Sequence, residues 1–220
     1  MKYTKKLLLL VATIAISLAL VNPALGISYK NVDFPSGDSS FADEVVEYQL
    51  NGGASSGDIN RILGIPDNYY VSLGAQGYAI IKFTDNSLTT SGDSEYDLAV
   101  FEAGSSTDEL VEVFISTNDQ DWIKLGNANR KTLFDIDSVN GVVQGEKYSY
   151  VKLVDYNGLN NGASYEGADM DAVGAITSTD PASGEDEEEN NSNEIPEFPT
   201  IALPIAAILG LAFFFQHRKD

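Results

Sequence analysis

Four carboxylates recur at equivalent positions of short apolar stretches, where together they could bind a metal ion. Each continues the alternation of a row of apolar side chains, so it is expected at the edge of a buried surface. An unpaired charge there is costly, and no lysine or arginine adjoins Glu102 or Asp171 in the sequence. We predict that a hard cation, calcium, is bound by Glu102, Asp155, Asp169 and Asp171. The alternative is that backbone amides or loop hydroxyls satisfy these side chains.

Tyrosines at expected strand ends and loops form a second group with a chemical use, because flat rings can stack on sugars. The alternative is that these rings cover the ends of the fold. Trp122, which follows an expected hairpin turn, is predicted to lie in the core. The candidates for ligand binding are Tyr69, Tyr70, Tyr156 and Tyr165.

Composition excludes several classes of chemistry. The 220-residue chain has no cysteine, and its one histidine is His217, near the C-terminus. Triad hydrolases and zinc enzymes are therefore not expected. The net charge of −20 repels nucleic acid. We expect a protein that is not an enzyme; a glycoside hydrolase with a carboxylate pair and a purely structural envelope component are the alternatives.

The elements that must position these residues are predicted to be strands. Between residues 27 and 176, short apolar runs are broken every 8 to 15 residues or so by Gly, Asn, Asp and Ser. This pattern indicates an all-β fold, a two-sheet antiparallel β-sandwich. Only residues 41–50 and 56–64 also suit a helix, the second capped by Ser56 or Asp58. The expected strands are "YYVSLG", "YAIIKFT", "YDLAVFEA", "LVEVFISTN", "DWIKLG", "YSYVKLVDY" and "MDAVGAIT".

The two ends of the chain predict export. Residues 1–26 combine lysines, an apolar run and "NPALG", which is typical of a signal peptide cleaved after Gly26. Residues 198–215 carry no charge and span about 27 Å as a helix, just enough to cross a membrane. The basic residues that follow would stay in the cytoplasm, which leaves the domain outside the cell.

An acidic segment separates the domain from the tail. Residues 177–195 contain a run of acids and almost no apolar side chain, so we expect a disordered linker. Asn190 begins its one glycosylation sequon.

The tail resembles the PEF-CTERM sorting signal of archaeal surface proteins over residues 196–220. The triplet Pro196, Glu197 and Phe198, the apolar helix and the basic end carry the resemblance. It implies processing by an archaeosortase, in addition to signal peptidase, and attachment of the product to a lipid. The helix would then be a temporary address and not a permanent membrane anchor.

The domain resembles discoidin-like, galactose-binding-type jelly rolls of surface proteins. The resemblance lies in "ILGIPDNYYVSLG", "YDLAVFEAG", "VFISTNDQDWIKLG", "YSYVKLVDY" and "GADMDAVGAI", in that order. It implies a non-catalytic adhesion or carbohydrate-binding domain, often with structural calcium. The partner would be a surface glycan or another envelope component.

Overall fold

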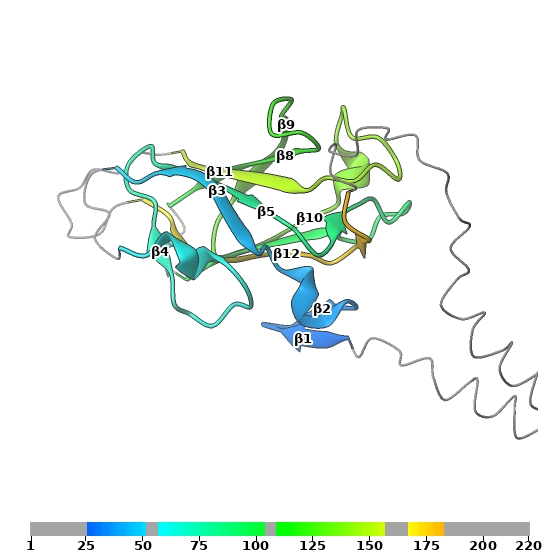
Figure 1. The fold of residues 1–220 in the computed structure, drawn as a ribbon, viewed down its shortest axis with the longest axis horizontal. Coiled ribbons are helices and arrows are strands. Elements are labelled where there is room, and N and C mark those ends of the chain that lie inside the picture. The colour runs from blue at the N-terminus through cyan, green and yellow to red at the C-terminus, as the bar shows by residue number, and fades with distance from the viewer. Residues whose placement is uncertain (1–25, 52–56, 104–108, 157–166, 183–220) are drawn as a thin grey trace, which may run out of the picture. The chain divides into compact units, whose positions relative to one another are not determined.

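The computed structural model describes residues 26–51, 57–103, 109–156 and 167–182 (Figure 1). The chain divides into two compact units, Met1–Ala182 and Ser183–Asp220, and the described residues all belong to the first. Residues 1–25 of the predicted signal peptide and the whole predicted apolar helix lie outside these residues. Among the described residues, no helix has the length and apolar character needed to cross a membrane.

Antiparallel strands form two large sheets, which confirms the predicted all-β fold. In Figure 1, β3, β5 and β11 lie above β12. The four-stranded sheet has the order β10 (Lys131–Phe134), β7 (Leu98–Glu102), β12 (Asp169–Ala175) and β4 (Val71–Ser72). The five-stranded sheet has the order β3 (Glu44–Gln49), β5 (Tyr78–Lys82), β11 (Tyr150–Asp155), β8 (Val111–Ser116) and β9 (Ile123–Ala128).

Short elements complete the domain. Two further sheets have two strands each, and three 3₁₀ helices lie in the connections. The small sheets are β1 (Ile27–Tyr29) with β2 (Val32–Phe34) and β6 (Ser87–Leu88) with β13 (Ser178–Thr179), and the 3₁₀ helices are η1 (Gly37–Ser40), η2 (Ile59–Ile62) and η3 (Ile136–Ser138).

The main core lies between the two large sheets, and strand periodicity produces it. On β8, Val111, Val113 and Ile115 are fully buried, whereas the residues between them are partly exposed. Leu153 and Ile81, on β11 and β5, belong to the same cluster. Because alternate residues of a strand point to one face, one apolar row per strand is enough to build this layer. Each such side chain stabilises the fold by about 1.5–3 kcal/mol.

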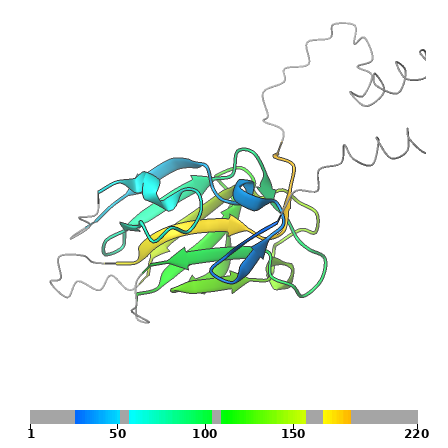
Figure 2. The same cartoon turned by 90° about the horizontal axis from the view of Figure 1, so that it is seen from below.

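A third layer covers the outer face of the four-stranded sheet. The β1–β2 hairpin and η1 place Phe34 and Phe41 against Phe101 and Ala172, in a second buried cluster. Figure 2 shows the blue N-terminal hairpin lying over the strands of this sheet. Gly174 permits the close approach, because a Cβ atom there would lie 2.7 Å from the ring of Phe34.

Local structure differs from the sequence prediction at two places. Residues 44–49 form strand β3, so the helical alternative for residues 41–50 is wrong. Pairing with β5 gives this segment backbone hydrogen bonds to a neighbouring strand, whereas a helix of about ten residues is only marginally stable on its own. The second expected helix is the single-turn η2, and its predicted cap is confirmed because the Asp58 side chain accepts a hydrogen bond from the Asn60 amide.

Candidate functional site

One end of the sandwich brings three carboxylates together. Glu102 is the last residue of β7, Asp169 is the first of β12, and Glu109 precedes β8. One carboxylate oxygen from each lies within 4.8 Å of the others. Two of these side chains were among the predicted calcium ligands. Glu109 was not, because it stands outside any regular alternation of apolar residues and only the folded chain brings it to this end.

A backbone amide and a serine hydroxyl donate hydrogen bonds to this acidic group. Glu102 is buried, and its Oε2 accepts a hydrogen bond of 2.9 Å from the Arg130 amide. The Ser72 hydroxyl donates a hydrogen bond to Asp169. Burial raises the pKa of the Asp169 carboxyl above its usual value, and the bond from Ser72 offsets part of that shift. A cation bound here would favour the ionised form of all three side chains.

Asp171 lies in a different place from the acidic group. The pairing of β12 with β7 shifts register between Met170 and Ala172, so a β-bulge at Asp171 breaks the alternation that had placed it with Asp169. Its Oδ2 accepts a hydrogen bond of 2.6 Å from the ammonium of Lys30, which forms an ion pair with it. The sequence offers no basic neighbour for this fully buried carboxylate, and the structure supplies one from 141 residues away.

Backbone amides complete the environment of Asp171 and provide that of Asp155. Oδ1 of Asp171 accepts hydrogen bonds from the amides of Asp67 and Asn68, at 3.2 and 3.1 Å. Asp155, which is buried at the end of β11, accepts hydrogen bonds from the amides of Gln76 and Ala168, at 3.0 and 3.1 Å. Asp155 and Asp171 therefore show the alternative given above for the predicted calcium ligands, in which backbone amides satisfy the carboxylates.

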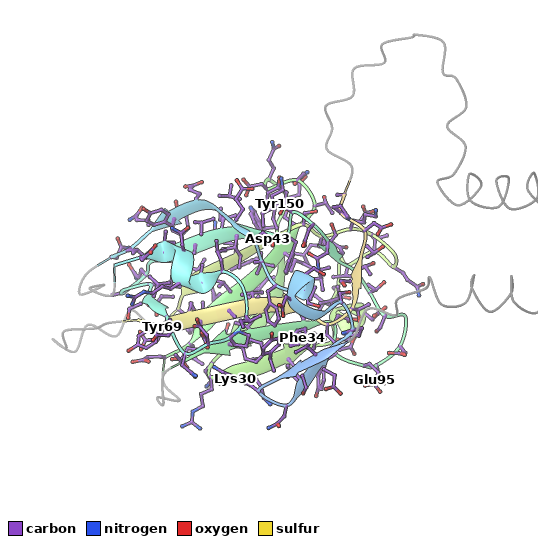
Figure 3. The ribbon with its side chains drawn as sticks, turned by 60° about the horizontal axis from the view of Figure 1, so that its bottom comes forward. Lys30, Phe34, Asp43, Tyr69, Glu95 and Tyr150 are labelled. Atoms are coloured by element: carbon purple, nitrogen blue, oxygen red, sulfur yellow. The ribbon has the colours of Figure 1, made fainter. Side chains whose placement is uncertain are left out.

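The candidate tyrosines are distributed over both sheets. Tyr69, just before β4, is 67% exposed, and Tyr156, just after β11, is 54% exposed. Tyr70 is half-buried, and its carbonyl accepts a hydrogen bond from Arg61. Figure 3 labels Tyr69 on the surface of the domain. Tyr165 lies outside the described residues, as do Asn190 and the motif residues 196–198.

The outer surface of the five-stranded sheet carries aromatic rings with lysines beside them. Lys152, on β11, lies 5.4 Å from the ring centre of Tyr78 and 5.7 Å from that of Trp122. Trp122 is therefore half-buried on the outside of the sandwich, and its predicted place in the core is wrong. The residue follows a turn and not a strand, so strand periodicity does not fix its side. We call this surface the aromatic face; it consists of Tyr78, Phe114, Trp122 and Tyr150 with Lys82, Lys124 and Lys152.

Comparisons with known proteins identify the tail. Residues 195–219 match the family model described as the PEF-CTERM archaeal protein sorting domain, which confirms the sorting signal predicted from the sequence. The match indicates that this chain is exported and sorted to the cell surface, with the β-sandwich as the domain so delivered.

One similar solved structure is the C-terminal domain of a chitobiase from Bacteroides fragilis. It is 13% identical in sequence, with a TM-score of 0.41, and the alignment covers 65% of this chain and 97% of that one. No curated protein matches the chain.

Proposed function

We propose that the β-sandwich is a non-catalytic binding domain that attaches a surface-sorted protein to a glycan of the cell envelope. The observation that carries the proposal is the aromatic face. Sugar rings stack on aromatic side chains, and ammonium groups beside the rings can donate hydrogen bonds to hydroxyl groups. Lys152, which lies between Tyr78 and Trp122, is suited to that role.

The charge of the aromatic face supports the same partner. The protein has a net charge of −20, yet three of the eight lysine and arginine residues that the structure describes lie on this face. They offset the acids nearby, of which Glu112 pairs with Lys124. The face is thus less acidic than the chain as a whole, which favours contact with a neutral or weakly anionic envelope glycan.

Glycan binding is best tested with an array probed by the full chain in detergent. Trp122→Ala removes the largest ring of the face and should weaken binding about fivefold or more, since the loss of an important interface side chain costs about 1 kcal/mol or more. Tyr96→Ala, which removes another exposed ring, is the matched control and should bind as the wild type does. Loss of binding with Tyr69→Ala or Tyr156→Ala but not with Trp122→Ala would move the site to those tyrosines. No binding to any glycan would favour the purely structural alternative.

We also propose that calcium stabilises the domain at Glu102, Glu109 and Asp169. Three oxygen ligands within 4.8 Å suit a hard cation, and solvent or backbone oxygens would supply the rest of its coordination. Calcium should raise the melting temperature, because an ion at a hundredfold excess over Kd stabilises the fold by about 2.7 kcal/mol. Glu109→Gln should remove this rise, whereas Glu95→Gln, at an exposed acid elsewhere, should keep it. An equal melting temperature in chelator and in calcium would contradict the assignment.

The alternative of a glycoside hydrolase has less support. Such enzymes hold two carboxyl groups roughly 5 to 10 Å apart in an open groove. In the acidic group Glu102 is buried, which leaves its carboxyl group little access to a sugar substrate. We expect no turnover of glycosides; turnover that Glu109→Gln abolishes would establish the enzyme instead.

A further inference from the structure

We infer, on the basis of the glycan binding proposed above, that Glu47 and Lys152 together select a neutral sugar over a negatively charged one. Lys152 belongs to the aromatic face, and Glu47 lies at its edge, on β3. In the five-stranded sheet, β5 separates β3 from β11, the strand of Lys152 (Figure 1). A bound sugar would therefore contact one acidic and one basic side chain on either side of a single strand.

The register of the three strands places the two side chains in one row on the outer surface of the sheet. Glu47 is opposite Ile80 on β5, and Ile80 is opposite Lys152 on β11. Directly opposed residues of neighbouring strands lie on the same side of a sheet. Neighbouring strands are about 4.8 Å apart, so about 10 Å separates the backbone of Glu47 from that of Lys152, a distance that the two side chains and one sugar unit can span.

Tyr78 connects the acidic side chain to the basic one. Its hydroxyl donates a hydrogen bond to Oε1 of Glu47, and its ring centre lies 5.4 Å from Nζ of Lys152. Glu47 is exposed, and its carboxylate can accept further hydrogen bonds because each oxygen has two lone pairs. The tyrosine thus holds the carboxylate in place and leaves it able to accept a hydrogen bond from a sugar hydroxyl.

The ammonium of Lys152 can donate to a ligand. Within the described ranges, Lys30 and Lys124 form the ion pairs that are found, whereas Lys152 has neither an ion pair nor a hydrogen bond. An ammonium carries three N–H donors, and a sugar hydroxyl can accept from any of them. The ring centre of Trp122 lies 5.7 Å from this ammonium, so a sugar stacked on the indole would have its hydroxyl groups beside it.

A second carboxylate near Lys152 adds to the negative charge at this place. Burial, and then the charge of Glu47, raise the pKa of the Asp119 carboxyl, whereas the charge of Lys152 lowers it. The three charged side chains are therefore near one another, and two of them are negative. A uronic acid would add a further negative charge, which like charges oppose. A neutral sugar avoids this repulsion, because each hydroxyl group can accept from the ammonium and donate to a carboxylate.

Matched pairs of oligosaccharides test this selection. Titration calorimetry of the full chain in detergent compares neutral oligosaccharides of glucose, galactose and mannose with the uronates made by oxidising the C6 position of each. At least one neutral oligosaccharide should bind, and its uronate should bind about fivefold more weakly or worse. A uronate that binds as tightly as its neutral counterpart would overturn the inference. So would a chain that binds some other glycan through Trp122 but none of these neutral sugars, and that result would leave the proposed function intact.

Two variants assign the selection to these residues. Lys152→Met removes the ammonium and should weaken binding of the neutral oligosaccharide about fivefold or more. Glu47→Gln keeps an acceptor but removes a charge, so the affinity of the uronate should approach that of the neutral sugar. Glu95→Gln and Lys147→Met, outside the aromatic face, should change neither affinity. Unchanged binding in Lys152→Met, when Trp122→Ala has lost it, would overturn the role of the lysine and not the glycan binding itself.

Acetylation of the wild-type chain provides a measurement that needs no variant. With the neutral oligosaccharide bound, the ammonium of Lys152 should be acetylated more slowly than in its absence, and that of Lys147 at the same rate. Mass spectrometry of the digested chain measures both rates. Equal acetylation of Lys152 with and without the bound sugar would contradict the direct contact.

Discussion

A single carboxylate, Asp171, joins three segments of the chain. It binds Lys30 in the N-terminal hairpin and the amides of Asp67 and Asn68, while it forms the bulge of β12 itself. Period-two alternation places this residue beside Asp169, but a bulge is a property of strand pairing that a single strand does not reveal. The contact with Lys30 is equally hidden, because 141 residues separate the partners.

Lys30→Met should lower the free energy of unfolding by about 2 kcal/mol. Breaking a fully buried pair costs about 3–5 kcal/mol, but Lys30 is partly exposed and the two amides remain with Asp171. Urea unfolding measures the change. Lys124→Met removes the other lysine that forms an ion pair in the described residues, on an exposed surface, and should cost less than about 1 kcal/mol. Equal losses in the two variants would contradict a special role for the buried carboxylate.

Asp119→Asn should change how stability depends on pH. Burial raises the pKa of the Asp119 carboxyl above 3.8, the charge of Glu47 raises it further, and Lys152 lowers it. The folded state therefore holds this proton more tightly than the unfolded state, and the group costs stability as pH rises from 3.8 through the raised pKa. The variant has no such proton, and asparagine accepts the left-handed φ of 61° found here.

The melting temperature across pH 3 to 7 measures the effect of Asp119→Asn. Relative to the wild type, the variant should gain stability as pH rises above about 4 and show no such gain below it. Asp121→Asn, at an exposed acid of the same turn, controls for the general loss of charge. A difference between Asp119→Asn and the wild type that stays constant over the whole range would refute this account.

At the scale of the elements, the central strands of the sandwich could be predicted from the sequence, whereas the N-terminal hairpin that packs on the outside of the four-stranded sheet could not. Buried and partly exposed residues alternate along most of β8 and along β11, so a period of two in the sequence is enough to predict these strands. The strands β1, β2 and β10 were not among those expected, because segments of three or four residues are too short to show a period. The aromatic face escaped prediction for a related reason: its rings come from several strands and a turn, so no local pattern joins them.

Gly174→Ala tests how tightly the N-terminal hairpin packs. An added Cβ would lie 2.7 Å from the Phe34 ring and 2.8 Å from the Phe41 ring, so the hairpin must shift outward. Such overpacking costs about 1–3 kcal/mol. Hydrogen exchange should show faster exchange in β2 than in β8, which packs on the other side of the domain. Uniform loss of protection, or none, would contradict a separately displaceable layer.

At the scale of the whole molecule, the sorting domain and the β-sandwich have separate requirements. The tail was readable from sequence because its motif, apolar stretch and basic end are contiguous, and residues 195–219 match the sorting family. The acidic group at the end of β7 could be predicted only in part. Glu102 and Asp169 follow strand periodicity, whereas Glu109 meets them only through the fold.

Processing should leave a mature chain shorter at both ends. We expect an N-terminus near Ile27 and loss of the residues that follow Phe198, because the signal peptide and the sorting tail are both removed. Intact-mass measurement of the protein extracted from membranes checks both ends at once. A species that retains residues 213–220 would show that the apolar segment is a permanent anchor.

The N-terminal hairpin can pack only after the strands beneath it have formed. The hairpin is the first described part of the chain to be synthesised, but it packs on Phe101 of β7 and Ala172 of β12. Its contacts therefore close a loop of about 140 residues, which is slow and cannot begin before β12 exists. A chain exported from its N-terminus onward would thus leave the apolar side chains of this hairpin exposed until nearly the whole domain had emerged.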